Sequence, residues 1–226
     1  MSRLLILSNR VAIPGQATAG GLAVALDEAL GKGGGMWCGW SGDIREYPRT
    51  RSHQNGQDEY LVTDLTREDH EDYYVGFSNS TLWPLFHYRT DLLRYNQDQY
   101  DGYLRVNWQF AELVALHAKP NDIVWVHDYH MIPMALALQE RGVKSRTGFF
   151  LHIPFPALET LSVLPVATEI IRALCAYDLL GFQTESDLRA FVRCASELLG
   201  ASTFGPIRNC MVDLRLKDRR CRAGCF

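Results

Sequence analysis

The chain has 226 residues, of which 47% are hydrophobic and 22% are charged, and its formal net charge is -3. These values are typical of a globular protein of about one large domain, and they exclude the strongly basic surface that nucleic-acid binding requires. No apolar run approaches the ~20 residues of a membrane span, and no small-residue cleavage site follows the short apolar start MSRLLILSNR, so we expect neither a membrane segment nor a signal peptide.

The first predicted elements are a strand, a loop and a helix that together suit an anion. Residues 4–7 predict a short buried strand that leads into Ser8-Asn9-Arg10, and the pair Gly20-Gly21 precedes an apolar helix over 22–30. Glycines let backbone N–H groups approach a phosphate, and a helix N-terminus favours negative charge. The segment matches neither common phosphate-loop pattern, so a tight turn is the alternative. Arg10 favours the anion, because its guanidinium can hold a phosphate by two charge-assisted hydrogen bonds.

Trp37 and Trp40 lie among glycines in the next segment. Such tryptophans can pack in the core against closely approaching backbone, or they can offer a flat face to a sugar or a base. Taken alone, this pair favours the core. Residues 43–59 are polar without a regular pattern and predict a surface loop, and residues 60–62 predict another strand.

A capped helix and an aromatic-rich stretch follow. Thr66 and Asp69 predict a capping box for a helix over residues 66–74. Residues 77–89, FSNSTLWPLFHYR, mix aromatic rings with hydroxyl and amide groups. Core segments rarely mix them so closely, because each buried polar group needs a partner, whereas sugars present both apolar faces and hydroxyl edges. This stretch therefore predicts a carbohydrate site, and a long helix over about residues 100–117 comes after it.

The central unit of the chain, residues 121–156, predicts strand, helix, strand. The first strand ends in His127-Asp128-Tyr129-His130 and the second in His152. Both strands are apolar without alternation, as expected for strands covered on both faces and joined by a right-handed parallel crossover. In open α/β sheets, ligands bind at the carboxyl ends of the strands. Histidines that only cap strands are the alternative, but His and Asp grouped at two neighbouring strand ends favour a site.

The rest of the chain divides into a patterned part and an unpatterned tail. A helix over about 165–176, a strand over 178–182 and a helix that starts after Thr184 and ends at Gly200 follow from periodicity and capping. Residues 201–226 contain six Arg or Lys and two Asp, a local charge near +4, with no clear period. We expect an irregular basic tail, with binding of an acidic partner as the less favoured alternative.

The cysteines indicate a reducing compartment. There are six, and none forms a C-x-x-C pair, so neither zinc nor a redox dithiol is indicated. Cys175 and Cys194 lie in apolar helical patterns and are predicted to be buried thiols.

Taken together and in order, these segments resemble the trehalose-6-phosphate synthase family of retaining glycosyltransferases over about residues 1–200. Each match is short and weak alone, and their order makes the resemblance specific. The matching segments are Ser8-Asn9-Arg10, Gly20-Gly21-Leu22, Trp37-Cys38-Gly39-Trp40-Ser41-Gly42, Tyr73-Tyr74, Phe77-Ser78-Asn79, Leu82-Trp83-Pro84, Phe86-His87-Tyr88, Asp101-Gly102-Tyr103, Val126-His127-Asp128-Tyr129-His130, Phe150-Leu151-His152-Ile153-Pro154-Phe155-Pro156 and Asp178-Leu179-Leu180-Gly181-Phe182-Gln183-Thr184.

The resemblance implies an α/β fold with a Rossmann-like, doubly wound, mainly parallel sheet. Residues 1–200 would form the N-terminal, acceptor-binding domain of a two-domain GT-B arrangement, and residues 201–226 the basic tail, with the second GT-B domain missing. In the family that second domain grips the donor diphosphate and nucleotide. We therefore expect residues 1–226 alone to be a poor catalyst.

The family moves glucose from UDP-glucose to glucose 6-phosphate, and the resemblance carries this reaction over as an expectation. It implies a cytoplasmic protein with these two ligands, no metal or other cofactor, no nucleic-acid or membrane partner, and scope for a homo-oligomer in the full-length form. The site residues that it implies are Arg10, Tyr74 and Trp83 for the acceptor and its phosphate, Gly21 for the donor diphosphate, and Trp40, Asp128 and His152 where the two sugars meet, with Asp128 and His152 as the catalytic candidates.

Two other functions stay open. One is a non-catalytic module that binds glucose 6-phosphate or joins a synthase complex. The other is a related transferase with a different phosphorylated acceptor, such as glycerol 3-phosphate in a glucosylglycerol-phosphate synthase.

Overall fold

The structure, a computed structural model, describes residues 2–13, 21–30, 34–217 and 219–226. The strands are β1 (Leu4–Arg10), β2 (Gly35–Ile44), β3 (Thr50–Asn55), β4 (Asp58–Leu65), β5 (Ile123–His127), β6 (Arg146–Phe150), β7 (Leu179–Phe182), β8 (Ser202–Thr203), β9 (Met211–Leu216) and β10 (Arg219–Cys225). The helices are α1 (Gly21–Leu30), α2 (Arg67–Asp69), the π-helix η1 (His70–Leu82), α3 (Trp83–Phe86), α4 (Gln97–Ala115), the 3₁₀ turn η2 (Tyr129–Met131), α5 (Met134–Glu140), α6 (Leu158–Leu161), α7 (Ala167–Leu174) and α8 (Glu185–Leu199).

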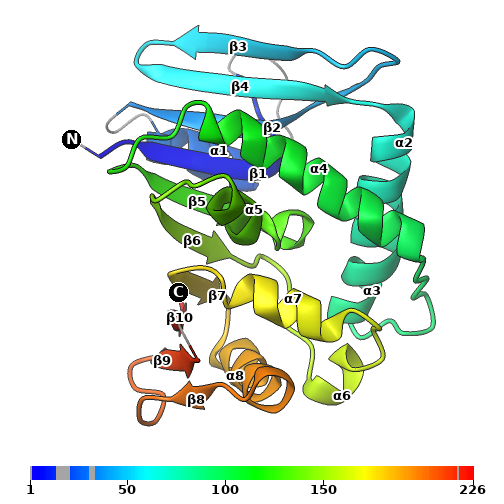
Figure 1. Cartoon of the computed structure of the whole chain (residues 1–226), viewed down its shortest axis with the longest axis vertical. Helices are drawn as coiled ribbons and strands as arrows, with labels where there is room; N and C mark the ends of the chain where they lie inside the picture. Colours follow the sequence, from blue (N-terminus) through cyan, green and yellow to red (C-terminus); the bar gives the residue numbers. More distant parts are fainter. Residues whose placement is uncertain (1, 14–20, 31–33, 218) are drawn as a thin grey trace.

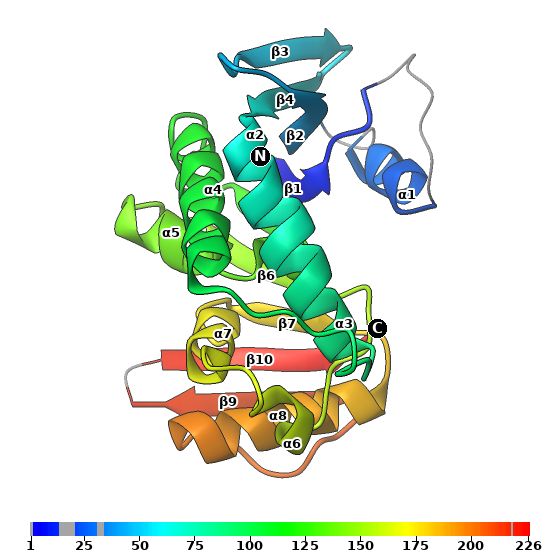
Figure 2. The ribbon, with the colours of Figure 1, turned by 90° about the vertical axis from the view of Figure 1, so that its right-hand side faces the viewer.

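The strands form one sheet in the order β3-β4-β2-β1-β5-β6-β7-β10-β9-β8 (Figure 1). Neighbours from β4 to β10 are parallel, and antiparallel strands lie only at the two margins. Helices α4, α5 and α7 lie in front of the sheet in Figure 1, and Figure 2 shows α1 on the opposite face from α4 and α5. The expected α/β, Rossmann-like, mainly parallel sheet is therefore confirmed.

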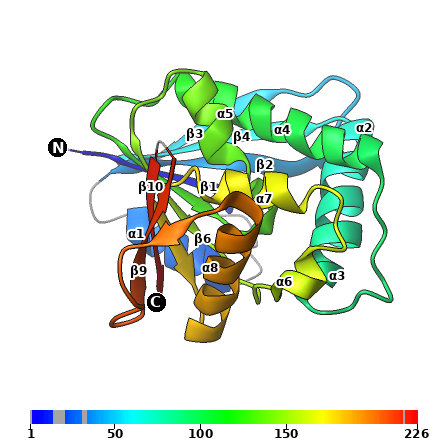
Figure 3. The ribbon, with the colours of Figure 1, turned by 60° about the horizontal axis from the view of Figure 1, so that its bottom comes forward.

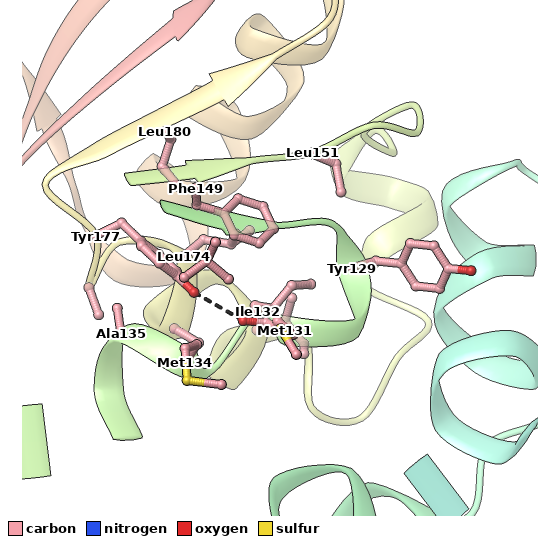
Figure 4. Close-up of a cluster of buried hydrophobic side chains, with 14 of the residues drawn as sticks. Tyr129, Met131, Ile132, Met134, Ala135, Phe149, Leu151, Leu174, Tyr177 and Leu180 are labelled. Atoms are coloured by element: carbon pink, nitrogen blue, oxygen red, sulfur yellow. Dashed lines mark hydrogen bonds between the residues drawn. The ribbon is translucent and has the colours of Figure 1, made fainter. Parts of the chain in front are cut away.

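The core lies mainly between the sheet and the α4–α5–α7 layer. Figure 4 shows Phe149 and Leu180 of the sheet facing Met134 and Leu174 of the helices, all 2% exposed or less. The Tyr177 hydroxyl donates to the Met131 carbonyl oxygen at 3.0 Å, so this buried hydroxyl keeps a partner. Each such large apolar side chain contributes roughly 1.5–3 kcal/mol when it is fully buried. This layer holds η2, and with it the residues after β5, in a fixed position.

Several sequence predictions for local structure are confirmed. The Thr66 side chain accepts from Asp69 N at 2.9 Å, and the Thr184 side chain caps α8 by accepting from Asp187 N at 3.2 Å. Gly200 ends α8 in the left-handed conformation, with φ 66°. Each cap satisfies backbone groups that a helix end leaves without an intrahelical partner, which fixes where the helix begins or ends.

The predicted surface loop over residues 43–59 is wrong. Most of it belongs to the hairpin β3–β4, in which Asn55 pairs with Asp58 and the two-residue loop is Gly56-Gln57, with Gly56 at φ 63°. A glycine at the first position of a two-residue hairpin loop favours such a turn, because glycine adopts positive φ without steric cost. This glycine is visible in the sequence, but the polar composition of the edge strand β3 favoured the prediction of a loop.

The predicted irregular tail over residues 201–226 is also wrong. β10 pairs in parallel with β7 and antiparallel with β9, which lies beside it in Figure 3, so the tail extends the main sheet. Of its basic residues, Arg222 pairs with Asp213 at 2.7 Å and Arg219 with Asp178 at 3.5 Å. Cys221 and Ala223 alternate with exposed arginines and are at most 1% exposed. This is the period of two of a half-buried strand, which the local charge had obscured.

The aromatic-rich stretch 77–89 is largely core, which corrects the view that it forms a carbohydrate site as a whole. It forms the end of η1 and all of α3, along the right-hand side of Figure 1. Its buried residues are Phe77, Ser78, Thr81, Leu82, Pro84, Leu85 and Phe86. The Thr81 hydroxyl bonds to the Arg94 carbonyl oxygen, whereas Ser78 Oγ has no partner among the described residues. Only the other face of this segment, with Asn79, Trp83 and His87, is left to meet a ligand.

The π-helix explains how this second face forms. In η1 the Trp83 N–H bonds to the Ser78 carbonyl oxygen, five residues back, so residues five apart share a face. Tyr74 and Asn79 are five apart, and both contact η2. An α-helix would point them in different directions. Gly102 of α4 lets η1 approach closely, since a Cβ there would lie 2.3 Å from the Asp72 side chain.

Candidate functional site

The candidate site lies where the winding of the sheet reverses. β1 is flanked by β2 on one side and by β5 on the other, with Arg10 opposite Trp40 and Leu7 opposite Val126. Ligands of doubly wound sheets bind in the crevice at such a switch point, at the carboxyl ends of the strands. Arg10 ends β1 and Asp128 follows β5, so the topology places a cation and a carboxylate on the two sides of this crevice.

Arg10 is an exposed cation on a fixed backbone. The Ser8 hydroxyl donates to the Arg10 carbonyl oxygen at 3.0 Å, and the neighbouring Asn9 side chain accepts from the Tyr73 hydroxyl at 2.9 Å. The guanidinium lies over Gly42, where φ is 93° and a Cβ would come within 2.6 Å of it. Within the part of the chain that the structure describes, no carboxylate pairs with Arg10. Its guanidinium N–H groups can therefore hold an anion.

Aromatic rings from β2, η1 and η2 form one wall. The Trp40 ring centroid is 5.5 Å from that of Tyr74 and 5.3 Å from that of His70, and Tyr74 stacks on His130 at 5.7 Å with an interplanar angle of 15°. Trp40 is only 6% exposed, whereas Tyr74 is half-buried. Tyr74 is therefore the ring that a ligand can reach, and Trp40 supports it from β2.

Hydrogen bonds join this wall to the turn after β5. The Tyr129 hydroxyl donates to Asn79 Oδ1 at 2.8 Å, and Figure 4 shows its ring pointing from η2 toward the π-helix. The Tyr103 hydroxyl of α4 donates to the Tyr129 carbonyl oxygen at 2.8 Å and accepts from Ile132 N at 3.1 Å. These bonds leave the backbone around Asp128 little freedom to move.

Asp128 occupies a strained and desolvated position. Its φ is 73°, which is uncommon for a residue with a side chain. Its N–H donates to the Phe150 carbonyl oxygen at 2.9 Å, and its Oδ1 accepts from His152 N at 3.2 Å. Burial raises the Asp128 pKa to about 6, although backbone hydrogen bonds and the nearby His87 oppose the rise. Strain of this kind clusters at functional sites.

His152 follows β6 and contacts the histidine that ends β5. His152 Nε2 and His127 Nδ1 lie 3.0 Å apart, and the two rings stack at 5.3 Å. Burial lowers the pKa of both imidazoles, that of His127 to about 3, and His152 also opposes a charge on His127. Both rings are neutral near pH 7, so the pair shares a single proton between its facing nitrogens.

Trp83 borders the same crevice from α3. It is 38% exposed and stacks on His87 at 4.2 Å, with His87 Nδ1 2.8 Å from the Trp83 carbonyl oxygen. His87 is close enough to Asp128 to affect its pKa. The exposed Trp83 ring thus offers a flat apolar surface at the rim of the crevice.

Gly21 is the predicted site residue that the structure leaves apart from the others. It is the first residue of α1, on the face of the sheet opposite α4 (Figure 2). Its neighbour Gly20 lies outside the described residues. The other predicted residues are linked by the contacts above, and we call them the carboxyl-edge cluster: Arg10, Trp40, Tyr74, Trp83, Asp128 and His152.

Sequence reasoning missed His87 and His70 as neighbours of this cluster. His87 lies four residues after Trp83, a spacing that brings two rings together on a helix, and this was the available signal. His70 contacts Trp40 because η1 crosses the end of β2, and nothing local in the sequence indicates that crossing.

Other features of the described residues do not suggest a different kind of site. Among them, no three His, Cys, Asp or Glu side chains gather as metal ligands would, and no helix is long and apolar enough to cross a bilayer. A cavity of about 690 Å³ lies at the opposite edge of the sheet, by the amino ends of β5–β7. It is lined by Arg146, Arg220 and Arg222 but also by Asp178 and Asp213. The aspartates offset much of its positive charge.

Comparison with known proteins gives a consistent result. The profile of Glycosyltransferase family 20 matches residues 7–222. The trehalose-6-phosphate synthase of Klebsiella pneumoniae is 47% identical over 195 residues, and that of Sinorhizobium fredii is 50% identical over 201 residues. These matches cover 85% and 86% of the chain but 41% and 43% of the relatives, so the chain spans less than half the length of these relatives.

Solved structures agree over the whole chain. An alpha,alpha-trehalose-phosphate synthase (UDP-forming) from Burkholderia xenovorans, in complex with glucose-6-phosphate, superposes with a TM-score of 0.91 at 46% identity, covering 99% of this chain and 49% of that one. The E. coli protein bound with UDP-2-fluoro glucose gives a TM-score of 0.91 at 41% identity, covering 100% of this chain and 48% of that one. The likeness extends past residue 200, where the sequence resemblance was expected to end.

Proposed function

The chain belongs to glycosyltransferase family 20, and from this membership we propose that it is the acceptor-binding part of a UDP-forming trehalose-6-phosphate synthase. The complete reaction breaks the bond between glucose C1 and the diphosphate of UDP-glucose and joins C1 to the sugar of glucose 6-phosphate. The observation that carries the proposal is the carboxyl-edge cluster, because it combines a cation that pairs with no carboxylate among the described residues, exposed ring faces and a desolvated carboxylate at the switch point of the sheet. Relatives with these two ligands, from Burkholderia xenovorans and E. coli, support it.

Arg10 is proposed to hold the phosphate of glucose 6-phosphate. A guanidinium matches two phosphate oxygens at once, and Gly42 leaves it room to lie flat against the backbone. Tyr74 and Trp83 would pack against the apolar face of the sugar ring, with Trp40 supporting Tyr74. Held at both its phosphate and its ring, the acceptor loses the freedom to present the wrong hydroxyl.

Asp128 and His152 are proposed to lie where the two sugars meet. The Asp128 carboxylate, which backbone N–H groups of Tyr129 and His152 orient, would accept a hydrogen bond from a sugar hydroxyl. A neutral His152 can donate or accept a hydrogen bond without bringing a charge into the crevice. The donor diphosphate would approach the N-terminus of α1 at Gly21, because the first N–H groups of a helix have no intrahelical partner and favour an anion. UDP-glucose is a substrate in this scheme, and the scheme needs no metal.

We further propose that residues 1–226 alone bind glucose 6-phosphate weakly and transfer glucose negligibly. Retaining transfer needs donor and acceptor face to face, with positive charge on the leaving diphosphate. Among the described residues, Arg10 is the one cation of the carboxyl-edge cluster. The six free cysteines are consistent with a cytoplasmic location.

The test is calorimetric titration of the chain with glucose 6-phosphate, glycerol 3-phosphate and glucose, together with a transfer assay that uses UDP-glucose. Preference for glucose 6-phosphate over both other compounds supports the proposal. Preference for glycerol 3-phosphate indicates the related transferase. Product formation at about 1–1000 per second, the usual range of enzymes, would show that the chain is itself a catalyst.

A further inference from the structure

The histidine that ends β5 has a structural setting that the proposed reaction does not use. His127 is 1% exposed and packs against Trp125, with ring centroids 4.3 Å apart. Its Nδ1 faces His152 Nε2 at 3.0 Å. Its Nε2 is buried and meets no hydrogen-bond partner in the part of the chain that the structure describes. His127 therefore cannot reach a ligand, and its one polar contact is with a residue that can.

We propose that His127 is a positioning residue, which donates Nδ1–H to His152 and so fixes His152 as the tautomer with its proton on Nδ1. The sugar ligand of the proposed function would then meet a hydrogen-bond donor on His152, not a base. The assignment of His127 rests on the geometry of the pair, and only the identity of the ligand rests on the proposed function.

Two arrangements of the shared proton compete. If His152 Nε2 donates, the proton of His127 must sit on Nε2, where an N–H is buried without an acceptor. If His127 Nδ1 donates, its Nε2 is a bare lone pair. Buried N–H groups without an acceptor are rarer in proteins than buried acceptors without a donor, so the second arrangement is favoured. A charged pair, in which one ring is an imidazolium that donates to the other, is opposed by burial, which lowers both pKa values.

The rest of the His152 ring is available to a ligand. The side chain is half-buried, and its Nδ1 has no hydrogen-bond partner within the described ranges. Its backbone N–H is held by Asp128 Oδ1 at 3.2 Å, and Phe150 lies against its ring at 4.7 Å. With Nε2 occupied by His127, Nδ1 is the atom left to face the crevice. The identity of the ring nitrogen that carries the proton is set by the bond that the other nitrogen makes.

The test is a long-range proton–nitrogen correlation spectrum of the chain labelled with ¹⁵N at histidine, recorded near pH 7 without ligand. The set of signals that disappears in the His152→Asn variant is assigned to His152. We expect the Nδ1–H form of His152 to exceed the Nε2–H form by about tenfold, a ratio that one hydrogen bond can support. A dominant Nε2–H form, which would place the His127 proton on its buried Nε2, would overturn the proposal.

Two variants test the mechanism. His127→Phe keeps an aromatic ring but removes the donor, and it should abolish the tenfold preference, whereas His127→Asn offers an amide N–H near the position of Nδ1 and should keep it. His130→Phe is the matched control, because His130 is also buried, with 8% exposed, and makes no hydrogen bond to His152 among the described residues. An unchanged tautomer in His127→Phe would refute the role of His127. If that variant does not fold, the spectrum of the unmutated chain still decides.

Adding glucose 6-phosphate separates this inference from the proposed function. Predicted tautomers in a chain that binds no sugar phosphate would refute the proposed function and support the role of His127. Sugar-phosphate binding by a chain in which His152 carries its proton on Nε2 would support the proposed function and refute the role of His127.

Discussion

Replacement of Asp128 by Asn should stabilise the protein at neutral pH, and the gain should depend on pH. Burial raises the folded-state pKa of Asp128 to about 6 from an ordinary 3.8. The folded chain therefore keeps a proton that the unfolded chain releases between these values. Stability falls as the pH rises through this window, because the folded state must then ionise a carboxyl in a poor solvent environment.

The magnitude follows from the size of the shift. A shift of about two pH units corresponds to about 3 kcal/mol of unfolding free energy, present as a penalty above pH 6 and absent below the unfolded pKa. Asparagine cannot ionise and keeps an oxygen for the His152 N–H, and it tolerates the φ of 73°. Its advantage over Asp128 should therefore grow by about 1.4 kcal/mol between pH 5 and pH 8.

Urea unfolding of both proteins at pH 5 and pH 8 measures this difference, since every other titrating group cancels between them. Asp91→Asn is the matched control. Asp91 is exposed and paired with Arg89, which lowers its pKa, so this substitution should not stabilise the protein at pH 8. If the advantage of Asp128→Asn is the same at both pH values, Asp128 is not desolvated as described, and the reasoning fails.

Three further substitutions test the carboxyl-edge cluster. Arg10→Ala should weaken glucose 6-phosphate binding by roughly 1.5–3 kcal/mol in calorimetry and leave the melting temperature nearly unchanged, because the side chain is exposed and unpaired within the described residues; an unchanged affinity would remove Arg10 from the site. Gly42→Ala should displace the Arg10 guanidinium, since the added methyl group would come within 2.6 Å of it at a φ of 93°; we expect weaker binding of the same ligand, and normal binding would show that the guanidinium acts from another position. His152→Ala, assayed in a full-length family 20 enzyme carrying residues 1–226, should lower turnover much more than it lowers the melting temperature; normal turnover per folded molecule with a large loss of stability would make His152 a structural cap.

The parts of the fold that the sequence predicted well are those with local signals. The apolar runs of β5, β6 and β7 predicted buried parallel strands, and the Thr184 and Gly200 signals placed both ends of α8. These features depend on neighbouring residues alone. Because the carboxyl ends of parallel strands share one edge of a sheet, the same apolar runs also predicted that Asp128 and His152 lie close together.

The parts that failed depend on partners distant in sequence or on an unusual helix. The basic composition around β10 concealed a strand that pairs with β7 and β9, and the polar composition of β3 concealed a strand that ends in the hairpin loop Gly56-Gln57. The 3.6-residue period could not show that Tyr74 and Asn79 share a face, because η1 is a π-helix. The buried face of this π-helix also includes Phe77, Ser78, Thr81 and Leu82, which belong to the predicted sugar-binding stretch.

The central claim is that glucose 6-phosphate binds at the carboxyl edge of the sheet, with its phosphate on Arg10. The most direct measurement is a crystal structure of residues 1–226 soaked with glucose 6-phosphate. We expect two phosphate oxygens within hydrogen-bond distance of the Arg10 guanidinium and the sugar ring between Trp83 and Asp128. Glucose 6-phosphate held instead by Arg146, Arg220 and Arg222, in the cavity at the opposite edge of the sheet, would contradict the account.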